Sequence, residues 1–440
     1  MHTAFRLFPL ALLLACDPFS EETPTDTAPE APAGVDQCTE TYTVPGSFGI
    51  LLDKEIAPHE LTFGGTQWLG AEGASNSLTP DPAYVHLGWP GRDTSTSISF
   101  AWMTDKGTLA SQVQWGVGDA LDNTTDGVSF TFGGTDTEGF RVHELKLCGR
   151  LQPNTTYSYR VGGEGHWSPT YQFSTPPAPG TFDTFTVAIA GDSRGAYEDW
   201  ANIVSRMEAH NPDFYMFSGD MVEAGGNQIE WDGWWRATGD VFARKVFVPA
   251  HGNHEFLAMN YFAQFSLPNN EQWFSLNYGS LSLTALNDTV AEEAQMADDE
   301  VVFLREKLST DTSPWKFVMH HRPIYSTCTR HGSDEVLRGD WAPVFEEVGV
   351  DMVIAGHNHI YERSVPIQAE QERPVGQGTT YLVSGGAGAS LYQESEADWF
   401  NEVANPIEHY IIAEFSAEGV NATVYDRDDT VIDSFFLPAP

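Results

Sequence analysis

The sequence has few basic residues, few cysteines and little charge beyond its acidic groups. Only 22 lysine and arginine residues stand against 62 aspartate and glutamate residues, a formal charge of −40 over 440 residues. Such a chain has too little positive charge to neutralise a run of phosphates, so we expect no nucleic-acid partner. Charged residues make up only 19% of the chain, and its 40 glycines and 26 prolines favour a strand- and turn-rich globular protein over a coiled coil.

The first fifteen residues read as a targeting signal. Arg6 precedes the apolar run Leu7–Ala15, which is too short to span a bilayer and has the length of a signal-peptide core. The run ends in Leu-Leu-Ala-Cys16, which resembles the bacterial lipobox, whose cysteine is lipidated and becomes the new N-terminus. An ordinary secretory signal is the alternative. We therefore expect an exported protein, lipid-anchored in the bacterial cell envelope through Cys16 or else secreted.

The segment that follows predicts a tether. Residues 16–36 are rich in Pro, Thr, Glu and Asp and nearly free of large apolar groups, so they cannot bury enough surface to fold. No later run of about 18 apolar residues exists, so the lipid is the only membrane contact we expect. With Cys16 lipidated, one pairing joins Cys38 to Cys148 and leaves Cys328 as a free thiol, although the sequence does not decide it.

The N-terminal half has the pattern of a β-sandwich. Residues 37–79 predict a strand-rich extension, and residues 80–177 contain short alternating segments separated by Gly, Asp, Asn and Pro. The run Leu151–Val161 resembles the L-x-P-x-T-x-Y-x-Y pattern of fibronectin type III domains, in which a tyrosine bonds back to the backbone. No chemistry is evident in this part of the chain, so we expect it to be a structural domain.

The C-terminal half, residues 183–435, changes period and predicts an α/β domain. Apolar runs alternate with helical patterns, and five of the runs end in polar residues, at the strand ends where ligands bind in such folds. These polar residues are Asp192, Asp220, the series Asn253-His254-Glu255, the pair His320-His321, and His357 with His359. A mixed set of oxygen and imidazole ligands favours transition-metal ions, one or two of them.

In this order, the motifs are similar to those of the calcineurin-like metallophosphoesterases. The matching elements are Gly191-Asp192, Gly219-Asp220, Gly252-Asn253-His254-Glu255, a strand-end histidine at His320, and Gly356-His357-Asn358-His359. Their surroundings, with the fibronectin-like domain in front, resemble the purple acid phosphatase branch. The resemblance implies a dinuclear centre with three sets of ligands. Asp192 and His359 would hold one ion, Asn253, His320 and His357 the other, and Asp220 would bridge both.

The resemblance also implies an activity. It predicts a metal-dependent phosphoester hydrolase, an acid phosphatase-like phosphomonoesterase acting on a small phosphorylated substrate through a metal-bound hydroxide. His254 would contact a phosphoryl oxygen or protonate the leaving group. His331, Arg194 and Arg322 are substrate-side candidates, with an exposed loop histidine and surface salt bridges as the plain alternatives. A phosphodiesterase on the same site, or a surface binding module with an inactive phosphatase-like domain, are the other functions consistent with the sequence.

One position departs from the purple enzymes, which have a tyrosine three residues after the bridging aspartate. This chain has Glu223 there. We therefore expect no tyrosinate charge-transfer band, and Fe, Zn and Mn all remain open as the two ions. Glu223 is a ligand, an outer-sphere group or a solvated loop acid on this reading, and we favour the last two.

Overall fold

The computed structural model describes residues 61–62, 78–132, 139–289 and 295–439. The predicted signal, Cys16, the tether and nearly all of residues 37–79 lie outside the described residues, so those predictions stay predictions. The chain divides into two units, Met1–Val35 and Asp36–Pro440, and everything described below belongs to the second. No helix in the described part is both long and apolar enough to cross a membrane.

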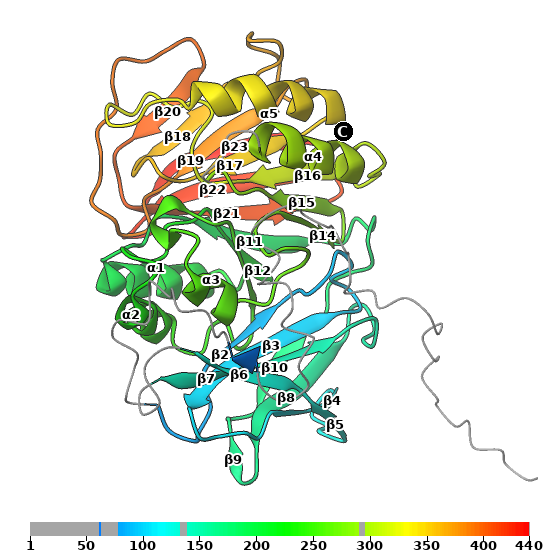
Figure 1. The fold of residues 1–440 in the computed structure, drawn as a ribbon. Coiled ribbons are helices and arrows are strands. Elements are labelled where there is room, and N and C mark those ends of the chain that lie inside the picture. The colour runs from blue at the N-terminus through cyan, green and yellow to red at the C-terminus, as the bar shows by residue number, and fades with distance from the viewer. Residues whose placement is uncertain (1–60, 63–77, 133–138, 290–294, 440) are drawn as a thin grey trace, which may run out of the picture. The chain divides into compact units, whose positions relative to one another are not determined.

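The N-terminal part is a β-rich domain of two sheets (Figure 1). The first sheet has the order β1 (Leu61–Thr62), β6 (Val128–Phe132), β7 (Phe140–Leu147), β3 (Ile98–Asp105) and β2 (Ala83–Gly88). The second has the order β10 (Tyr171–Ser174), β8 (Thr156–Gly163), β4 (Gln112–Val117) and β5 (Asn123–Asp126), with β9 (His166–Trp167) beside β8. The alternating runs of the sequence are therefore strands: β4 buries alternate residues, whereas β3 is buried on both faces.

Aromatic side chains fill the core of this domain. The ring of Phe100 on β3 lies 4.7 Å from that of Tyr159 on β8, which joins the two sheets. The Tyr157 hydroxyl accepts the backbone N–H of Gln152 at 2.9 Å, the back-bond that the sequence pattern suggested. Cys148 is disulfide-bonded, and Cys328 is a free, buried thiol. The pairing of Cys148 with Cys38 concerns a residue outside the described ones and stays a prediction.

The C-terminal part is an α/β domain with two further sheets. One has the order β13 (Val246–Pro249), β12 (Phe214–Phe217), β11 (Phe185–Ala190), β21 (His409–Phe415), β22 (Gly419–Asp426) and β23 (Val431–Pro438). The other has the order β14 (Phe274–Tyr278), β15 (Leu281–Ala285), β16 (Trp315–Met319), β17 (Met352–Ala355), β19 (Thr380–Ser384), β18 (Tyr361–Ser364) and β20 (Asn401–Asn405). We call them the first and the second sheet of this domain. The five predicted apolar runs are strands β11, β12, β13, β16 and β17, which pair in parallel within their sheets.

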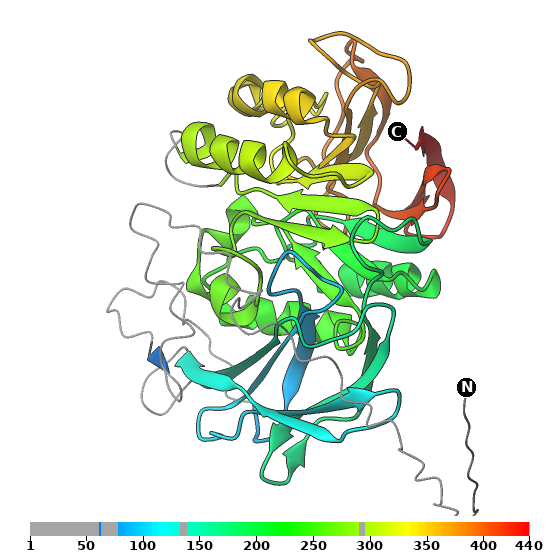
Figure 2. The ribbon, with the colours of Figure 1, turned by 90° about the vertical axis from the view of Figure 1, so that its right-hand side faces the viewer.

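Helices cover both sheets (Figures 1 and 2). Beside the first sheet lie α1 (Tyr197–Ala209), α2 (Gln228–Thr238) and α3 (Met259–Gln264); beside the second lie α4 (Val301–Leu308), preceded by the π-helical turn η3 (Gln295–Glu300), and α5 (Glu335–Val348). In α1 the buried residues Trp200, Ile203, Val204 and Met207 follow the three- and four-residue spacing of one helix face. The short 3-10 turn η2 (Asn253–Glu255) follows β13.

The two domains share hydrogen bonds next to the first sheet of the α/β domain, the sheet that contains β13. The backbone N–H of Leu87 on β2 donates to the carbonyl oxygen of Phe242 at 2.9 Å, and the Tyr159 hydroxyl donates to the carbonyl oxygen of Ala243 at 2.6 Å. Both acceptors lie in the segment just before β13, which begins at Val246. The β-rich domain therefore supports the strand whose far end leads into η2.

Candidate metal centre

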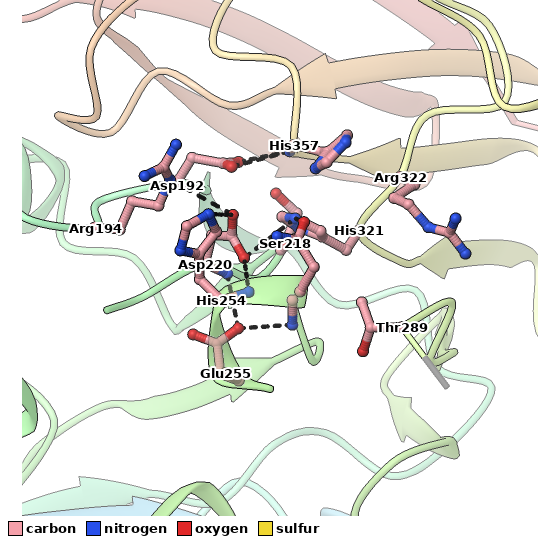
Figure 3. Close-up of polar contacts among 12 residues, drawn as sticks. Asp192, Arg194, Ser218, Asp220, His254, Glu255, Thr289, His321, Arg322 and His357 are labelled. Carbon is pink, nitrogen blue, oxygen red and sulfur yellow. Dashed lines mark hydrogen bonds and ion pairs between the residues drawn. The ribbon is translucent and has the colours of Figure 1, made fainter. Parts of the chain in front are cut away.

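The polar strand ends of the two sheets meet at one place (Figure 3). Asp192 follows β11 and Asp220 follows β12 in the first sheet, whereas His321, His357 and His359 follow β16 and β17 in the second. Their side chains form two groups, Asp192 with Asp220 and His359, and Asp220 with His321 and His357. Within each group the potential ligand atoms lie within 4.8 Å of one another. Asp220 is the member common to both.

Unusual backbone conformations aim these side chains. Asp192, Asp220 and His357 have φ angles of 62°, 57° and 65°, in the left-handed region that non-glycine residues seldom occupy. Each such residue costs on the order of 1–3 kcal/mol, and such residues concentrate at functional sites. Gly356 makes the close approach possible, because a Cβ atom there would lie 2.3 Å from Asp192 Oδ2. The chain therefore gives up stability to build this cluster.

Two histidines hold one ring nitrogen against a backbone carbonyl and turn the other toward a carboxylate. Nδ1–H of His359 donates to the carbonyl oxygen of Ser390 at 2.7 Å, which leaves Nε2 facing Asp192 Oδ1 at 3.5 Å. The second histidine, His321, donates Nδ1–H to the carbonyl oxygen of Ser218 at 2.7 Å, and its Nε2 lies 3.3 Å from Asp220 Oδ1. In a neutral ring Nε2 is an acceptor. The lone pair of each Nε2 therefore faces the lone pairs of a carboxylate oxygen, with no hydrogen between them. A cation between the atoms resolves this, and backbone-oriented histidines are typical of metal ligands.

Asn253 completes the second group. Its Oδ1 lies 3.1 Å from His321 Nε2, so two oxygen atoms and a ring nitrogen converge with no hydrogen to share between them when the ring is neutral. Without an ion, a proton takes that place: although burial lowers it, the pKa of His321 rises to about 10 because of the negative charge of Asp220. For the Asp220 carboxyl, burial by itself raises the pKa. The neighbouring His321 and His254 outweigh burial and hold that pKa below its ordinary value. The donor set thus demands positive charge at its centre.

The structure differs from the sequence prediction at the histidine pair after β16. His320, predicted as a ligand, points away from the cluster: its Nδ1 bonds to Asp288 Oδ2 at 3.0 Å and its ring packs edge-on against Trp341. The next residue, His321, occupies the place beside Asp220. Consecutive side chains at the end of a strand point to opposite sides, so only one of the pair can face the cluster. The assignment of His320 was one residue out of register.

Glu255 is a residue of the site to which the sequence assigned no role. Its fully buried carboxylate accepts the backbone N–H groups of Gly252, Asp220 and Met221 at 2.7, 3.0 and 2.8 Å. It thereby fixes the loop after β12 to the turn η2 (Figure 3). Burial, followed by the charge of Asp220, raises the pKa of Glu255 to about 7. The signal available was an acidic residue directly after Asn253-His254, which suggests a ligand as readily as a support.

His254 and Arg194 stand at the edge of the cluster. His254 donates Nδ1–H to the carbonyl oxygen of Glu223 at 2.7 Å, and its Nε2 lies 3.9 Å from Asp220 Oδ2. Arg194 donates Nη1–H to Glu223 Oε2 at 2.6 Å and Nη2–H to the Tyr392 hydroxyl at 3.2 Å, with Nε 3.7 Å from Asp220 Oδ2. Glu223, at the position of the missing tyrosine, is therefore engaged with arginine.

The two other substrate-side candidates differ from each other. The ring of His331 is exposed and lies 4.3 Å from that of His357, so it faces the cluster. Arg322 is held instead by the carboxylates of Asp288 and Asp334, at 3.6 and 3.1 Å. Its guanidinium lies on the far side of His321 from Asp220 in Figure 3. The salt-bridge alternative therefore describes the surroundings of Arg322, and its contact with substrate stays a prediction.

Comparison with known proteins agrees with this geometry. Residues 185–361 match the family model of the calcineurin-like phosphoesterases, and residues 82–175 match that of the purple acid phosphatase N-terminal domain. The chain thus combines a calcineurin-like phosphoesterase domain with a purple acid phosphatase N-terminal domain. The metallophosphoesterase is accordingly a hydrolase of phosphoric ester bonds that works with metal ions.

Several relatives of the metallophosphoesterase are phosphatases by name. It is 28% identical over 316 residues to purple acid phosphatase 22 of Arabidopsis thaliana, across 67% of this chain and 70% of that one. It is 26% identical over 370 residues to acid phosphatase type 7 of Homo sapiens, across 73% and 81% of the two chains. The structure of the purple acid phosphatase PPD1 from yellow lupin (Lupinus luteus) seeds superposes with a TM-score of 0.71 at 21% identity, over 81% of this chain and 74% of that one. This last similarity establishes the two-domain fold.

Proposed function

We propose that the metallophosphoesterase is an acid phosphatase-like phosphomonoesterase with two transition-metal ions. One ion is held by Asp192, His359 and Asp220, and the other by Asp220, Asn253, His321 and His357. The observation that carries this proposal is that Asp220 belongs to both ligand groups, which supports two neighbouring cation positions. Mixed carboxylate, amide and imidazole donors suit Fe, Zn and Mn.

The ions, when bound, supply Lewis acidity and make water a nucleophile at neutral pH. The chain itself supplies the groups around them. His254 is oriented by Glu223 so that Nε2 faces the centre, and only 21% of its side chain is exposed. We assign to Nε2 the contact with a phosphoryl oxygen, or the delivery of a proton to the leaving oxygen. Arg194 lies at the rim, where its positive charge favours the phosphate dianion, and the His331 ring lies beside that of His357, where it can form a hydrogen bond to substrate.

The substrate is a small phosphomonoester on this proposal. The chain as a whole has a large excess of acidic groups, −40 in formal charge, which repels polyanions. Glu223 serves here to hold Arg194 rather than to bind an ion, because its carboxylate is bonded to the guanidinium. The relatives that carry phosphatase names support the reaction class.

The location and the N-terminal domain belong to the same proposal. Export through the N-terminal signal, with a lipid on Cys16, would hold the enzyme at the cell envelope through residues 16–36. The β-rich domain would be a fibronectin type III-like support, in agreement with its tyrosine back-bond and its hydrogen bonds beside β13. Partition of the full chain into a detergent phase, and its loss in Cys16→Ala, tests the anchor. Equal partition of both proteins would contradict it.

The histidine pair after β16 provides a matched test of the metal centre. We expect His321→Ala to lose one of two ions and nearly all turnover of p-nitrophenyl phosphate, because Nε2 of His321 faces Asp220 and Asn253. His320→Ala removes the adjacent ring, which packs in the interior against Trp341. We expect it to lower the free energy of unfolding while the folded protein keeps two ions. Elemental analysis and kinetics on the same purified samples give the result.

Three outcomes would refute the proposal. If His320→Ala loses an ion while His321→Ala keeps both, the ligand assignment is wrong. If the wild-type protein holds stoichiometric metal and hydrolyses bis-p-nitrophenyl phosphate faster than the monoester, the enzyme is a diesterase. Wild-type protein with neither bound metal nor turnover would leave the binding-module alternative.

A further inference from the structure

An exposed aromatic side chain stands directly beside His254. Phe256 ends the turn η2, which carries Asn253 and His254, and 64% of its side chain is exposed. Its ring centroid lies 5.8 Å from that of His254. Among the large apolar side chains that the structure describes, only Leu109 is as exposed. A scattered apolar residue on a surface needs no explanation by itself, so the setting of this one decides its meaning.

The setting of Phe256 is a strained and firmly held turn. Phe256 and Leu257 have φ angles of 53° and 52°, a conformation that is a genuine outlier for bulky residues. Leu257 packs against the hydrophobic core and so fixes the turn to the interior of the domain. The backbone N–H of Ala258 donates to the carbonyl oxygen of Glu255 at 2.8 Å, and that of Gly225 donates to the carbonyl oxygen of His254 at 2.7 Å. The turn thus keeps the Phe256 ring at the surface rather than letting it fold into the core.

We propose that Phe256 determines substrate specificity by packing against an aromatic leaving group. This inference rests on the proposed function, in which His254 faces the leaving oxygen. In that reaction water forms a new bond to phosphorus, the bond from phosphorus to the ester oxygen breaks, and the ester oxygen leaves as an alcohol or phenol with one proton. A ring carried by that oxygen lies next to the His254 ring, within reach of Phe256. The preferred substrates are then aryl phosphates, and simple alkyl phosphates lack this contact.

The test compares the effect of one substitution on two esters. We expect Phe256→Ala to raise KM for phenyl phosphate about three- to tenfold, the range of aromatic pair energies, with kcat little changed. KM for glycerol 2-phosphate should stay within about twofold, and Phe256→Tyr should restore the phenyl phosphate value. Phe182→Ala is the matched control, because Phe182 is also exposed, at 48%, and precedes β11 at the end away from the centre. Equal changes for both esters in Phe256→Ala, or the same selective change in Phe182→Ala, would overturn the proposal.

A binding measurement separates this inference from the proposed function. Phenylphosphonate and methylphosphonate carry the same charged group and differ only in the ring. We expect calorimetry on metal-loaded protein to show that Phe256→Ala weakens binding of phenylphosphonate three- to tenfold and leaves methylphosphonate unchanged. Wild-type protein that hydrolyses neither ester would refute the phosphatase proposal, whereas equal affinities of wild type and Phe256→Ala for phenylphosphonate would refute the role of Phe256.

Discussion

The buried carboxylate of Glu255 offers the sharpest test of how the centre is supported. In Glu255→Gln the side chain keeps its shape, but one carboxylate oxygen becomes an amide that donates. Three backbone N–H groups, of Gly252, Asp220 and Met221, then compete for one acceptor, and at least one stays unpaired in the interior. A hydrogen bond to a charged group contributes about 1.5–3 kcal/mol, and an unpaired buried N–H costs about 1–3 kcal/mol.

Part of that energy is absent near neutral pH. Because the pKa of Glu255 is raised to about 7, its carboxyl is only partly ionised there in the metal-free protein. We therefore expect Glu255→Gln to lower the free energy of unfolding by about 2–4 kcal/mol. Displacement of Asp220 should also weaken metal binding about 10- to 100-fold, as loss of an outer hydrogen bond to a ligand does.

The assay combines chemical denaturation with elemental analysis after exhaustive buffer exchange. Glu414→Gln, an exposed glutamate on β21, is the control and should match wild type in both measurements. The reasoning fails if Glu255→Gln unfolds within about 0.5 kcal/mol of wild type and retains its full complement of metal. A loss of stability with unchanged metal content would show that Glu255 supports the loops without positioning Asp220.

Three further predictions concern the pH dependence of stability, the visible spectrum of the iron-loaded protein and the close backbone approach at Gly356. Burial raises the pKa of Asp351 from 3.8 to about 6, so the contribution of this carboxyl to stability should fall by roughly 2–3 kcal/mol as pH rises through that interval. The free energy of unfolding of wild type, measured relative to Asp351→Asn, should therefore fall by about that amount between about pH 4 and 7. Protein loaded with iron should show no tyrosinate band in its visible spectrum, because Glu223 replaces the usual ligand; a strong band would contradict this. Gly356→Ala should abolish turnover and metal binding, since the new Cβ would meet Asp192 Oδ2 at 2.3 Å, and an active, metal-replete variant would show that the backbone yields.

The sequence was informative for features that follow from the periodic spacing of its apolar and polar residues. Apolar runs that end in Asp or His located β11, β12 and β17, because a buried strand and its polar end are both visible in the order of residues. It failed where a single residue decides orientation. His320 and His321 are chemically identical, and only the packing of Trp341 on one side and the position of Asp220 on the other assign them.

Other features of the site have no local pattern to reveal them. The left-handed backbone of Asp192 and Asp220 is imposed by the surrounding loops, against the preference of the residues themselves. Glu255 acts through backbone N–H groups, which every residue carries, so no sequence motif marks its partners. Arg322 looked like a substrate contact because it adjoins the histidines, yet the carboxylates of Asp288 and Asp334 hold it.

The origin of the ligands in two separate sheets has a mechanical consequence. On the proposed assignment each ion is bonded to residues of both sheets, Asp192 with His359 in one case and Asp220 with His321 in the other. Each ion then cross-links the two sheets, and its binding free energy adds to the free energy needed to separate them. A chelator would therefore abolish the activity and also weaken the contact between the two sheets of the α/β domain.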